Sequence, residues 1–177
     1  IQGVLLVKYS ILKFKRNETY TMRDLEKLRG FLADKYRENT VFHNHLSDGY
    51  NYAYPKLQYK LIKNMLSIMG IGEDVTEINK KLFEEIDYLN IDGNLIFDIQ
   101  KEIEIFDDEI EFMGDKMYEY RFVTPYLPLN DKNFSKYLKR EYTLEQAITN
   151  NILEVLKGSG IWLEKENKIY VSADLQI

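Results

Sequence analysis

The sequence predicts an α/β protein of the α+β class, with a ferredoxin-like βαββαβ unit in its N-terminal part. Two amphipathic helical patterns, over residues 22–37 and 75–87, are flanked and separated by apolar segments with strand character. The resulting order of strand, helix, two strands, helix and strand is that of the split βαβ motif. Such a unit has an open antiparallel sheet face, which RNA-recognition-motif-like modules use to bind RNA.

The first strand and the first helix have clear signals. The run from Val4 to Phe14 is rich in apolar and β-branched residues, as a strand requires. Thr21 followed by Asp24 is typical of a helix N-cap with an acidic first turn. Gly30 lies inside this helix, where glycine costs about 1 kcal/mol relative to alanine. We therefore expect Gly30 to pack closely against a neighbouring element.

Residues 40–97 contain the remaining strands and the second helix of the predicted βαββαβ unit. A short strand is expected over residues 40–45, and residues 57–69 fit either two strands or one long bent strand. Asp74 and Glu77 resemble a capping box at the start of the helix over 75–87. Residues 89–97 then form a strand interrupted by a turn at 92–94.

The predicted domains are residues 1–98, the ferredoxin-like domain, and residues 99–177, a smaller α+β domain. A helical stretch begins at Asn130, and a capping box of Thr143 with Gln146 begins another helix, which Gly158-Ser159-Gly160 ends. Short strands are expected over residues 102–106, 109–113, 118–124, 161–163 and 169–171.

Composition narrows the classes of chemistry. The chain has no Cys, which excludes disulfides, thiol catalysis and cysteine-based zinc sites. The absence of Cys also fits a cytoplasmic location, which we expect. No stretch of 18 apolar residues occurs, so we expect no membrane span.

Charge is unevenly distributed along the chain, whose formal net charge is −5. Residues 1–72 contain 12 Lys and Arg against 6 Asp and Glu, whereas residues 73–119 contain 4 against 16. A polyanionic partner is therefore expected to bind the first third. Uneven solvation of surface charges would give the same pattern, so this interpretation stays open.

The two histidines of the chain lie in one tripeptide, His43-Asn44-His45. On a strand, side chains two residues apart point to the same face, and histidine acts as acid or base near neutral pH. Such a pair can take the proton of a 2′-hydroxyl and protonate the leaving 5′-oxygen, which cleaves RNA without a metal. We predict His43 and His45 as catalytic residues, with no cofactor.

Cationic and aromatic residues surround the histidine pair. The tyrosines at alternate positions, including Tyr52, offer rings for base stacking or a phenol for proton transfer. The predicted RNA-binding residues are Lys35, Arg37, Tyr50, Tyr54, Lys56, Lys60 and Lys63.

Other interpretations of these residues stay open. A His-x-His pair can bind zinc, although Asp48 is the one clear further ligand nearby in the sequence. Two histidines in an exposed loop are often simple surface residues. Alternating tyrosines are more commonly one packed strand face than a binding surface.

Five blocks of the sequence form a recognisable pattern. They are LRGFLADKYREN from Leu28, FHNHLSDGYNYAYPKLQYKLI from Phe42, GIGED from Gly70, RFVTPYLPLNDKNFSKY from Arg121 and NNILEVLKG from Asn150. Together they resemble the CRISPR-associated repeat-RNA processing endoribonucleases, in their subtype-B branch. The resemblance covers nearly the whole chain.

The resemblance implies a metal-independent endoribonuclease that cuts CRISPR transcripts within their repeats to release guide RNAs. It places the family's histidine pair at His43 and His45, its active-site tyrosine at Tyr52 and a helix-end lysine at Lys35. We assign His45 as the general base and His43 as its acid or orienting partner. CRISPR repeat RNA is the expected partner, with other CRISPR-associated subunits and a homodimer as further candidates and no membrane.

Three rival functions follow from the same residues. The first is a noncatalytic RNA-binding or complex-assembly protein of the same family, in which the histidines no longer cut RNA. The chain is acidic for an RNA nuclease, which implies weak RNA affinity or reliance on a partner. A structural or interaction protein would use the acidic residues 73–119 as its contact surface. A metal-dependent nuclease would use the His-x-His pair as ligands.

Overall fold

The computed structural model describes residues 5–42, 45–46, 49–50, 54–110, 114, 116–122, 126–164 and 168–173, with the backbone alone at 5, 45, 46, 49 and 50. The chain divides into two compact units. One unit is Val4–Glu111, and the other is Phe112–Ile177 together with Ile1–Gly3.

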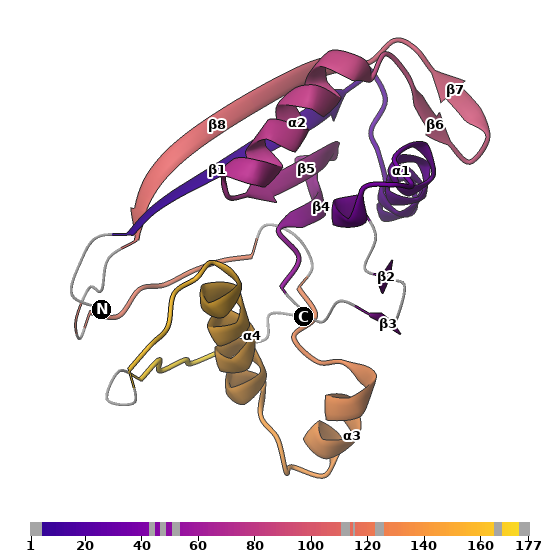
Figure 1. The fold of residues 1–177 in the computed structure, drawn as a ribbon. Helices are drawn as coiled ribbons and strands as arrows, with labels where there is room; N and C mark the ends of the chain where they lie inside the picture. The colour runs from indigo at the N-terminus through magenta and orange to yellow at the C-terminus, as the bar shows by residue number, and fades with distance from the viewer. Residues whose placement is uncertain are drawn as a thin grey trace. The chain divides into compact units, whose positions relative to one another are not determined.

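The first unit contains a four-stranded antiparallel sheet in the order β4-β5-β1-β8 (Figure 1). Its strands are β1 (Leu5–Lys15), β4 (Leu57–Ile62), β5 (Met65–Ile71) and β8 (Gln100–Ile110). Helix α1 (Met22–Lys35) follows β1, and helix α2 (Glu73–Glu85) follows β5. This arrangement confirms the predicted ferredoxin-like βαββαβ order, and residues 57–69 form two strands rather than one.

Both helices cover the same face of the sheet. Side chains at alternate positions of β1, Leu12 and Phe14, are fully buried, and so are Leu66 and Ile68 of β5. The helices contribute Leu25, Leu28, Leu32, Val75 and Leu82 to this core. Burial of one such side chain stabilises the fold by about 1.5–3 kcal/mol.

Helix α2 lies unusually close to β5 at Gly70. A Cβ placed on Gly70 would lie 2.9 Å from Val75 Cγ1 and 3.0 Å from Val75 O. Asn79 Nδ2 donates hydrogen bonds to Ser10 Oγ at 2.9 Å and to Ile68 O at 3.1 Å, which ties α2 to two strands. The Oδ1 atom of Asn79 is buried without a partner among the described residues, which is a polar cost of this close contact.

The helix starts agree with the sequence prediction in two cases. Thr21 and Asp24 form a reciprocal capping box on α1. Thr143 and Gln146 do the same on the last helix of the chain. Each box satisfies backbone N–H groups that the first turn of a helix leaves free.

The start of α2 differs from the prediction. Gly72 is the N-cap, with φ +96°, and no side chain caps this helix, so the predicted capping box of Asp74 and Glu77 is wrong. The N–H of Gly72 donates to Lys8 O at 2.7 Å. The chain therefore turns directly from β5 into α2, in a conformation that glycine adopts readily.

The sequence predicted residues 89–97 as the fourth strand of the sheet, and this prediction is wrong. They contain a separate hairpin of β6 (Leu89–Ile91) and β7 (Asn94–Ile96). Asp92 and Gly93 both have positive φ, which is typical of a two-residue type I′ turn. The fourth strand is β8, which lies beyond the predicted domain boundary at residue 98 and belongs to the sheet of the first unit.

The connection from α1 to β4 begins with a 3₁₀ helix, η1 (Thr40–Phe42), where a strand over 40–45 was predicted. Phe42 is buried, and its ring stacks on that of Tyr36 with centroids 5.1 Å apart. Because of this contact, residues 40–42 pack against the core as a helical turn and do not form an extended strand. Strands β2 (His45–Leu46) and β3 (Gly49–Tyr50) then form a small hairpin.

The described part of the second unit contains helices α3 (Asp131–Leu138) and α4 (Leu144–Gly158). Strands were predicted over residues 118–124, 161–163 and 169–171, but the described residues of these segments are not strands; residues 123 and 124 lie outside the described part. An apolar run becomes a strand only where another strand supplies hydrogen bonds, and the described residues of this unit supply none. No helix in the described part of the chain is long and apolar enough to cross a membrane.

Gly70→Ala is expected to lower the free energy of unfolding by about 1–3 kcal/mol, because the added methyl group overpacks the contact with α2. Gly30→Ala is the matched control, since no described atom lies within 4 Å of a Cβ at Gly30. The predicted close contact of Gly30 is therefore wrong, and this substitution should raise stability by roughly 0.5–1 kcal/mol. Urea unfolding measures both; native stability in Gly70→Ala would contradict the close approach of α2.

Candidate functional site

The two histidines lie on the connection between α1 and β4. The backbone of His45 begins β2 and pairs with Tyr50 of β3. His43, Asp48 and Tyr52 lie outside the described residues, as do the side chains of His45 and Tyr50. The catalytic assignments and the zinc alternative therefore stay predictions. Among the residues that the structure describes, no three His, Cys, Asp or Glu side chains are grouped as a metal site requires.

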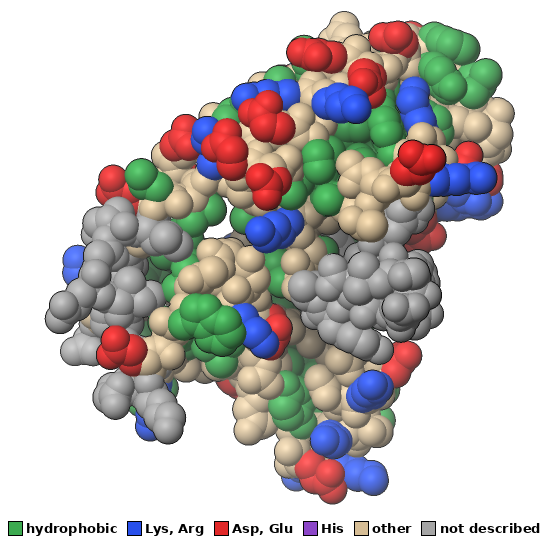
Figure 2. All heavy atoms as spheres, in the orientation of Figure 1, with side chains coloured by type: hydrophobic (Ala, Val, Ile, Leu, Met, Phe, Trp, Pro, Cys, Tyr) green, Lys and Arg blue, Asp and Glu red, His purple; other side chains and the backbone are tan. Residues whose placement is uncertain are grey.

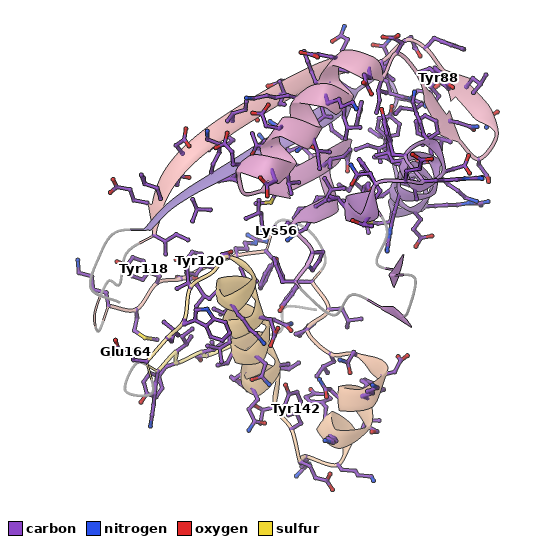
Figure 3. The ribbon with its side chains drawn as sticks, viewed as in Figure 1. Lys56, Tyr88, Tyr118, Tyr120, Tyr142 and Glu164 are labelled. Atoms are coloured by element: carbon purple, nitrogen blue, oxygen red, sulfur yellow. The ribbon has the colours of Figure 1, made fainter. Side chains whose placement is uncertain are left out.

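The end of α1 carries Lys35, whose ammonium group lies against two aromatic rings. Lys35 Nζ is 5.7 Å from the ring centroid of Phe31 and 5.2 Å from that of Tyr88. The Tyr88 ring contacts Phe31 at 5.8 Å and Phe97 at 5.4 Å between centroids. Figure 3 shows Tyr88 at the end of the unit where the β6–β7 hairpin lies. The rings attract the ammonium group without neutralising its charge.

Sequence reasoning missed this aromatic cluster of Phe31, Tyr88 and Phe97. Tyr88 lies far from Lys35 along the chain, between the predicted helix over 75–87 and the predicted strand over 89–97. Helical spacing does place Phe31 one turn before Lys35, which was the single local signal.

The residues that follow α1 are bound by carboxylates. Arg37 pairs with Asp34 one turn earlier, with its Nε 3.0 Å from Asp34 Oδ1. The hydroxyl of Tyr36 donates to Glu85 Oε2 at 3.1 Å. The predicted RNA-binding residue Arg37 is therefore partly neutralised, whereas Lys35 is not.

Strand β4 separates the predicted RNA-binding lysines. Tyr59 packs against the core beneath the helices, so the neighbouring Lys60 points to the opposite face of the sheet, where it is half-buried. Burial lowers the pKa of the Lys60 amine. Lys35 belongs to the helical side, and the structure therefore does not bring Lys35 and Lys60 to one surface.

The other candidates lie around the ends of β4. Lys56 is exposed just before the strand (Figure 3), and Lys63 is exposed in the turn that joins β4 to β5. Tyr54 is half-buried, and its hydroxyl accepts a hydrogen bond from Gln58 Nε2 at 2.6 Å. These residues adjoin Lys60 along the chain.

Ion pairs neutralise many of the positive charges in residues 1–72, the first third of the chain. Lys13 pairs with Glu104 and Lys15 with Glu102, both between β1 and β8. The hydrogen bond from Lys15 lowers the pKa of Glu102. Figure 2 shows acidic and basic side chains interspersed over this part of the surface. Seven of the 12 cations in residues 1–72 are paired in this way: Lys8, Lys13, Lys15, Arg16, Arg23, Lys27 and Arg37.

Five cations of the first third form no ion pair with any described residue. They are Arg29, Lys35, Lys56, Lys60 and Lys63. Four of these five are residues that the sequence predicted to bind RNA. Since no described carboxylate pairs with them, their charges are not neutralised by an ion pair, and those of the exposed Lys56 and Lys63 are available to phosphate groups.

Residues 6–109 match the family profile of the Cas6b N-terminal domain. The chain belongs to the Cas6b family. This finding confirms the subtype-B resemblance, and the match spans nearly all of the β4-β5-β1-β8 sheet. The family includes CRISPR RNA processing endoribonucleases.

Two solved structures extend the Cas6b likeness to most of the chain. One is a crystal structure of Cas6b, with a TM-score of 0.75 and 31% identity, covering 91% of this chain and 76% of that chain. The other is a crystal structure of a CRISPR RNA processing endoribonuclease, Cas6b, with a TM-score of 0.61 and 27% identity, covering 91% and 73%. A comparison with functionally curated proteins gives no match.

The buried tyrosines Tyr36 and Tyr59 predict how the stability of the fold depends on pH. Burial, with the hydrogen bond to Glu85, raises the pKa of Tyr36 to about 12, and burial raises the pKa of Tyr59 to about 12. An unfolded tyrosine has a pKa of about 10, so the folded chain holds more protons between these values. The contribution of these two tyrosines to the free energy of unfolding should therefore be constant below about pH 9 and fall as the pH rises from about 10 to about 12.

Tyr59→Phe serves as the control, measured by urea unfolding at each pH. It should remove part of the alkaline loss. At neutral pH it should leave stability unchanged or raise it by up to about 1 kcal/mol, because the Tyr59 hydroxyl has no hydrogen-bond partner among the described residues. A Tyr36→Phe/Tyr59→Phe variant with the native alkaline slope would contradict the assignment.

Proposed function

We propose that the chain is a metal-independent endoribonuclease that cleaves CRISPR repeat RNA to release guide RNAs. The observation that carries the proposal is the Cas6b match over residues 6–109, a range that includes both histidines. One solved structure similar to the chain is a CRISPR RNA processing endoribonuclease. The unpaired Lys35, Lys56, Lys60 and Lys63 add support, because RNA binding needs cations that no carboxylate has neutralised.

In the proposed reaction, His45 takes the proton of a 2′-hydroxyl, and the 2′-oxygen attacks the adjacent phosphorus. The bond from phosphorus to the 5′-oxygen breaks, and His43 donates a proton to that oxygen. The products are a 2′,3′-cyclic phosphate and a 5′-hydroxyl, and proton exchange with water returns both histidines to their starting states. Tyr52 supplies a phenol for proton transfer beside them.

Lys35 supplies positive charge to the phosphate as negative charge develops on its oxygens. Its ammonium group suits this role because aromatic rings, rather than a carboxylate, hold it. In this proposal Tyr88 is a positioning residue, which acts on the RNA through Lys35.

The same findings favour one alternative, a noncatalytic RNA-binding or assembly protein of the Cas6b family. An assembly role needs few free cations, which agrees with the net charge of −5 and with the ion pairing of seven cations in the first third. For either function the proposed location is the cytoplasm and the proposed partner is repeat RNA. Other CRISPR-associated subunits and a homodimer stay predictions.

The cleavage experiment incubates the pure chain with end-labelled repeat RNA in EDTA. The native chain should cut the RNA and leave a cyclic phosphate. His43→Ala and His45→Ala should each lower the rate by about 10²–10⁴, which is the usual contribution of a general acid or base. Asn44→Ala, between the two histidines, is the matched control and should keep the native rate.

Two outcomes would replace the proposal. RNA binding without cleavage by the native chain would leave the noncatalytic alternative. Cleavage that EDTA abolishes would indicate a metal-dependent nuclease.

Tyr88→Leu is expected to slow single-turnover cleavage at saturating RNA about two- to fivefold, because it removes a cation–π contact of about 0.5–1 kcal/mol. Tyr88→Phe keeps the ring and should keep the native rate. The Kd for RNA, measured beside the rate, separates positioning from binding. Equal rates for the leucine and phenylalanine variants would show that the ring does not position Lys35.

A further inference from the structure

Helix α3 of the second unit carries exposed cations that the proposed active site does not use. Lys132, Lys136 and Lys139 are separated by four and three residues, so they lie along one side of the helix over about 10 Å of its axis. Arg140 follows directly and is also exposed. Figure 2 shows Lys and Arg side chains gathered over α3. We call these four residues the α3 basic stripe.

The stripe has no partner within the described part of the chain. None of its four residues forms an ion pair there, although Asp131 and Glu141 flank it in the sequence. Lysines on α2 behave differently: Lys80 lies 2.5 Å from Glu77 Oε1, and Lys81 lies 3.7 Å from Glu85 Oε1. Like charges one turn apart destabilise a helix, so the stripe conflicts with the stability of α3.

The helix dipole explains only part of the stripe. Cations near the carboxyl end of a helix are favourable, which accounts for Lys136 and Lys139. Lys132 lies in the first turn, where the positive end of the dipole repels a cation. Its presence there therefore has no stabilising reason within the helix.

Arg140 is a second residue of the stripe whose presence the stability of α3 does not explain. Its N–H donates to Tyr137 O at 2.9 Å, and the N–H of Glu141 donates to Lys136 O at 2.9 Å, which together form a Schellman motif. Arg140 occupies the left-handed position of this motif, with φ +60°, where glycine is usual. The chain thus holds an arginine in a strained conformation that presents its side chain beside the lysines.

We propose that the α3 basic stripe binds the sugar-phosphate backbone of RNA, as a contact in addition to the histidine segment. The lysines act as point charges for successive phosphates, and the planar guanidinium of Arg140 can bind one phosphate through two hydrogen bonds. A polyanion removes the repulsion among these cations, which no described carboxylate does. The inference rests on the proposed function, because that function supplies RNA as the polyanion.

The decisive variant is Arg140→Gly, because its structural and functional effects have opposite signs. Glycine suits the left-handed position, so the melting temperature should stay the same or rise. RNA binding should weaken roughly fourfold at about 0.15 M salt, and the slope of log K against log salt should fall by about 0.7. A purely structural role for Arg140 cannot give a more stable chain that binds RNA less well.

The lysines are tested with Lys132→Gln/Lys136→Gln, which should weaken binding roughly 15-fold and lower the salt slope by about 1.4. Lys80→Gln/Lys81→Gln is the matched control, because it changes the net charge equally but removes paired lysines of α2. The control should change the Kd less than about twofold. Binding is measured with the full chain carrying His43→Ala and His45→Ala, so that the repeat RNA stays intact, and cleavage with the native histidines.

The outcomes separate this inference from the proposed function. Native binding and salt slope in the stripe variants would overturn the inference, while cleavage by the native chain would leave the proposed function in place. A chain that neither binds nor cuts RNA would overturn both. If the stripe variants instead lost binding to phosphatidylserine vesicles and kept RNA binding, the stripe would be a lipid contact and the inference would be wrong.

Discussion

The antiparallel pairing of β1 with β8 governs both the fold and the charge of the first unit. β1 is an inner strand, with β5 on one side and β8 on the other, so this pairing completes the ferredoxin-like order. It also places a strand rich in lysine beside a strand rich in Asp and Glu. The basic and acidic segments, which are separate in the sequence, therefore meet in ion pairs of Lys8, Lys13 and Lys15 with carboxylates of β8.

The cations that have no ion-pair partner among the described residues indicate where RNA could bind. Lys35 keeps its charge because its neighbours are aromatic rings, and the lysines around β4 keep theirs because β4 is remote from the acidic strand in the sheet order. Arg140 keeps its charge on a strained backbone in the second unit. In each case the local structure holds a cation without giving it a carboxylate, which is the property that an RNA-binding surface requires.

Much of the fold could be predicted from local patterns. Helical spacing and the Thr21–Asp24 box identified α1, and apolar content identified β1, because these signals lie within a few residues of one another. β8 was predicted as two short strands, over residues 102–106 and 109–113, with the acidic pair Asp107 and Asp108 left between them. The acidic residues of β8 lie beside lysines of β1, which are about 90 residues earlier in the chain. No local sequence pattern contains that information.

The candidate site shows the same limit. Residue type and spacing selected the histidine pair and four of the five unpaired cations of the first third, whereas the pairing of Arg37 with Asp34 was overlooked. The contact of Tyr88 with Lys35 depends on the packing of the β6 region against α1, which the sequence does not encode over a short range. Local chemistry can therefore nominate residues, but tertiary packing decides which charges remain available.

The acidic character of β8 has a consequence for self-association of the sheet. β8 is an edge strand, and an edge strand has backbone N–H and C=O groups that can pair with another chain. Two such edges brought together would place carboxylates such as Asp107, Asp108 and Glu109 against their counterparts, and like charges across strands are unfavourable. The strand that neutralises the lysines of β1 thus also guards this edge against aggregation.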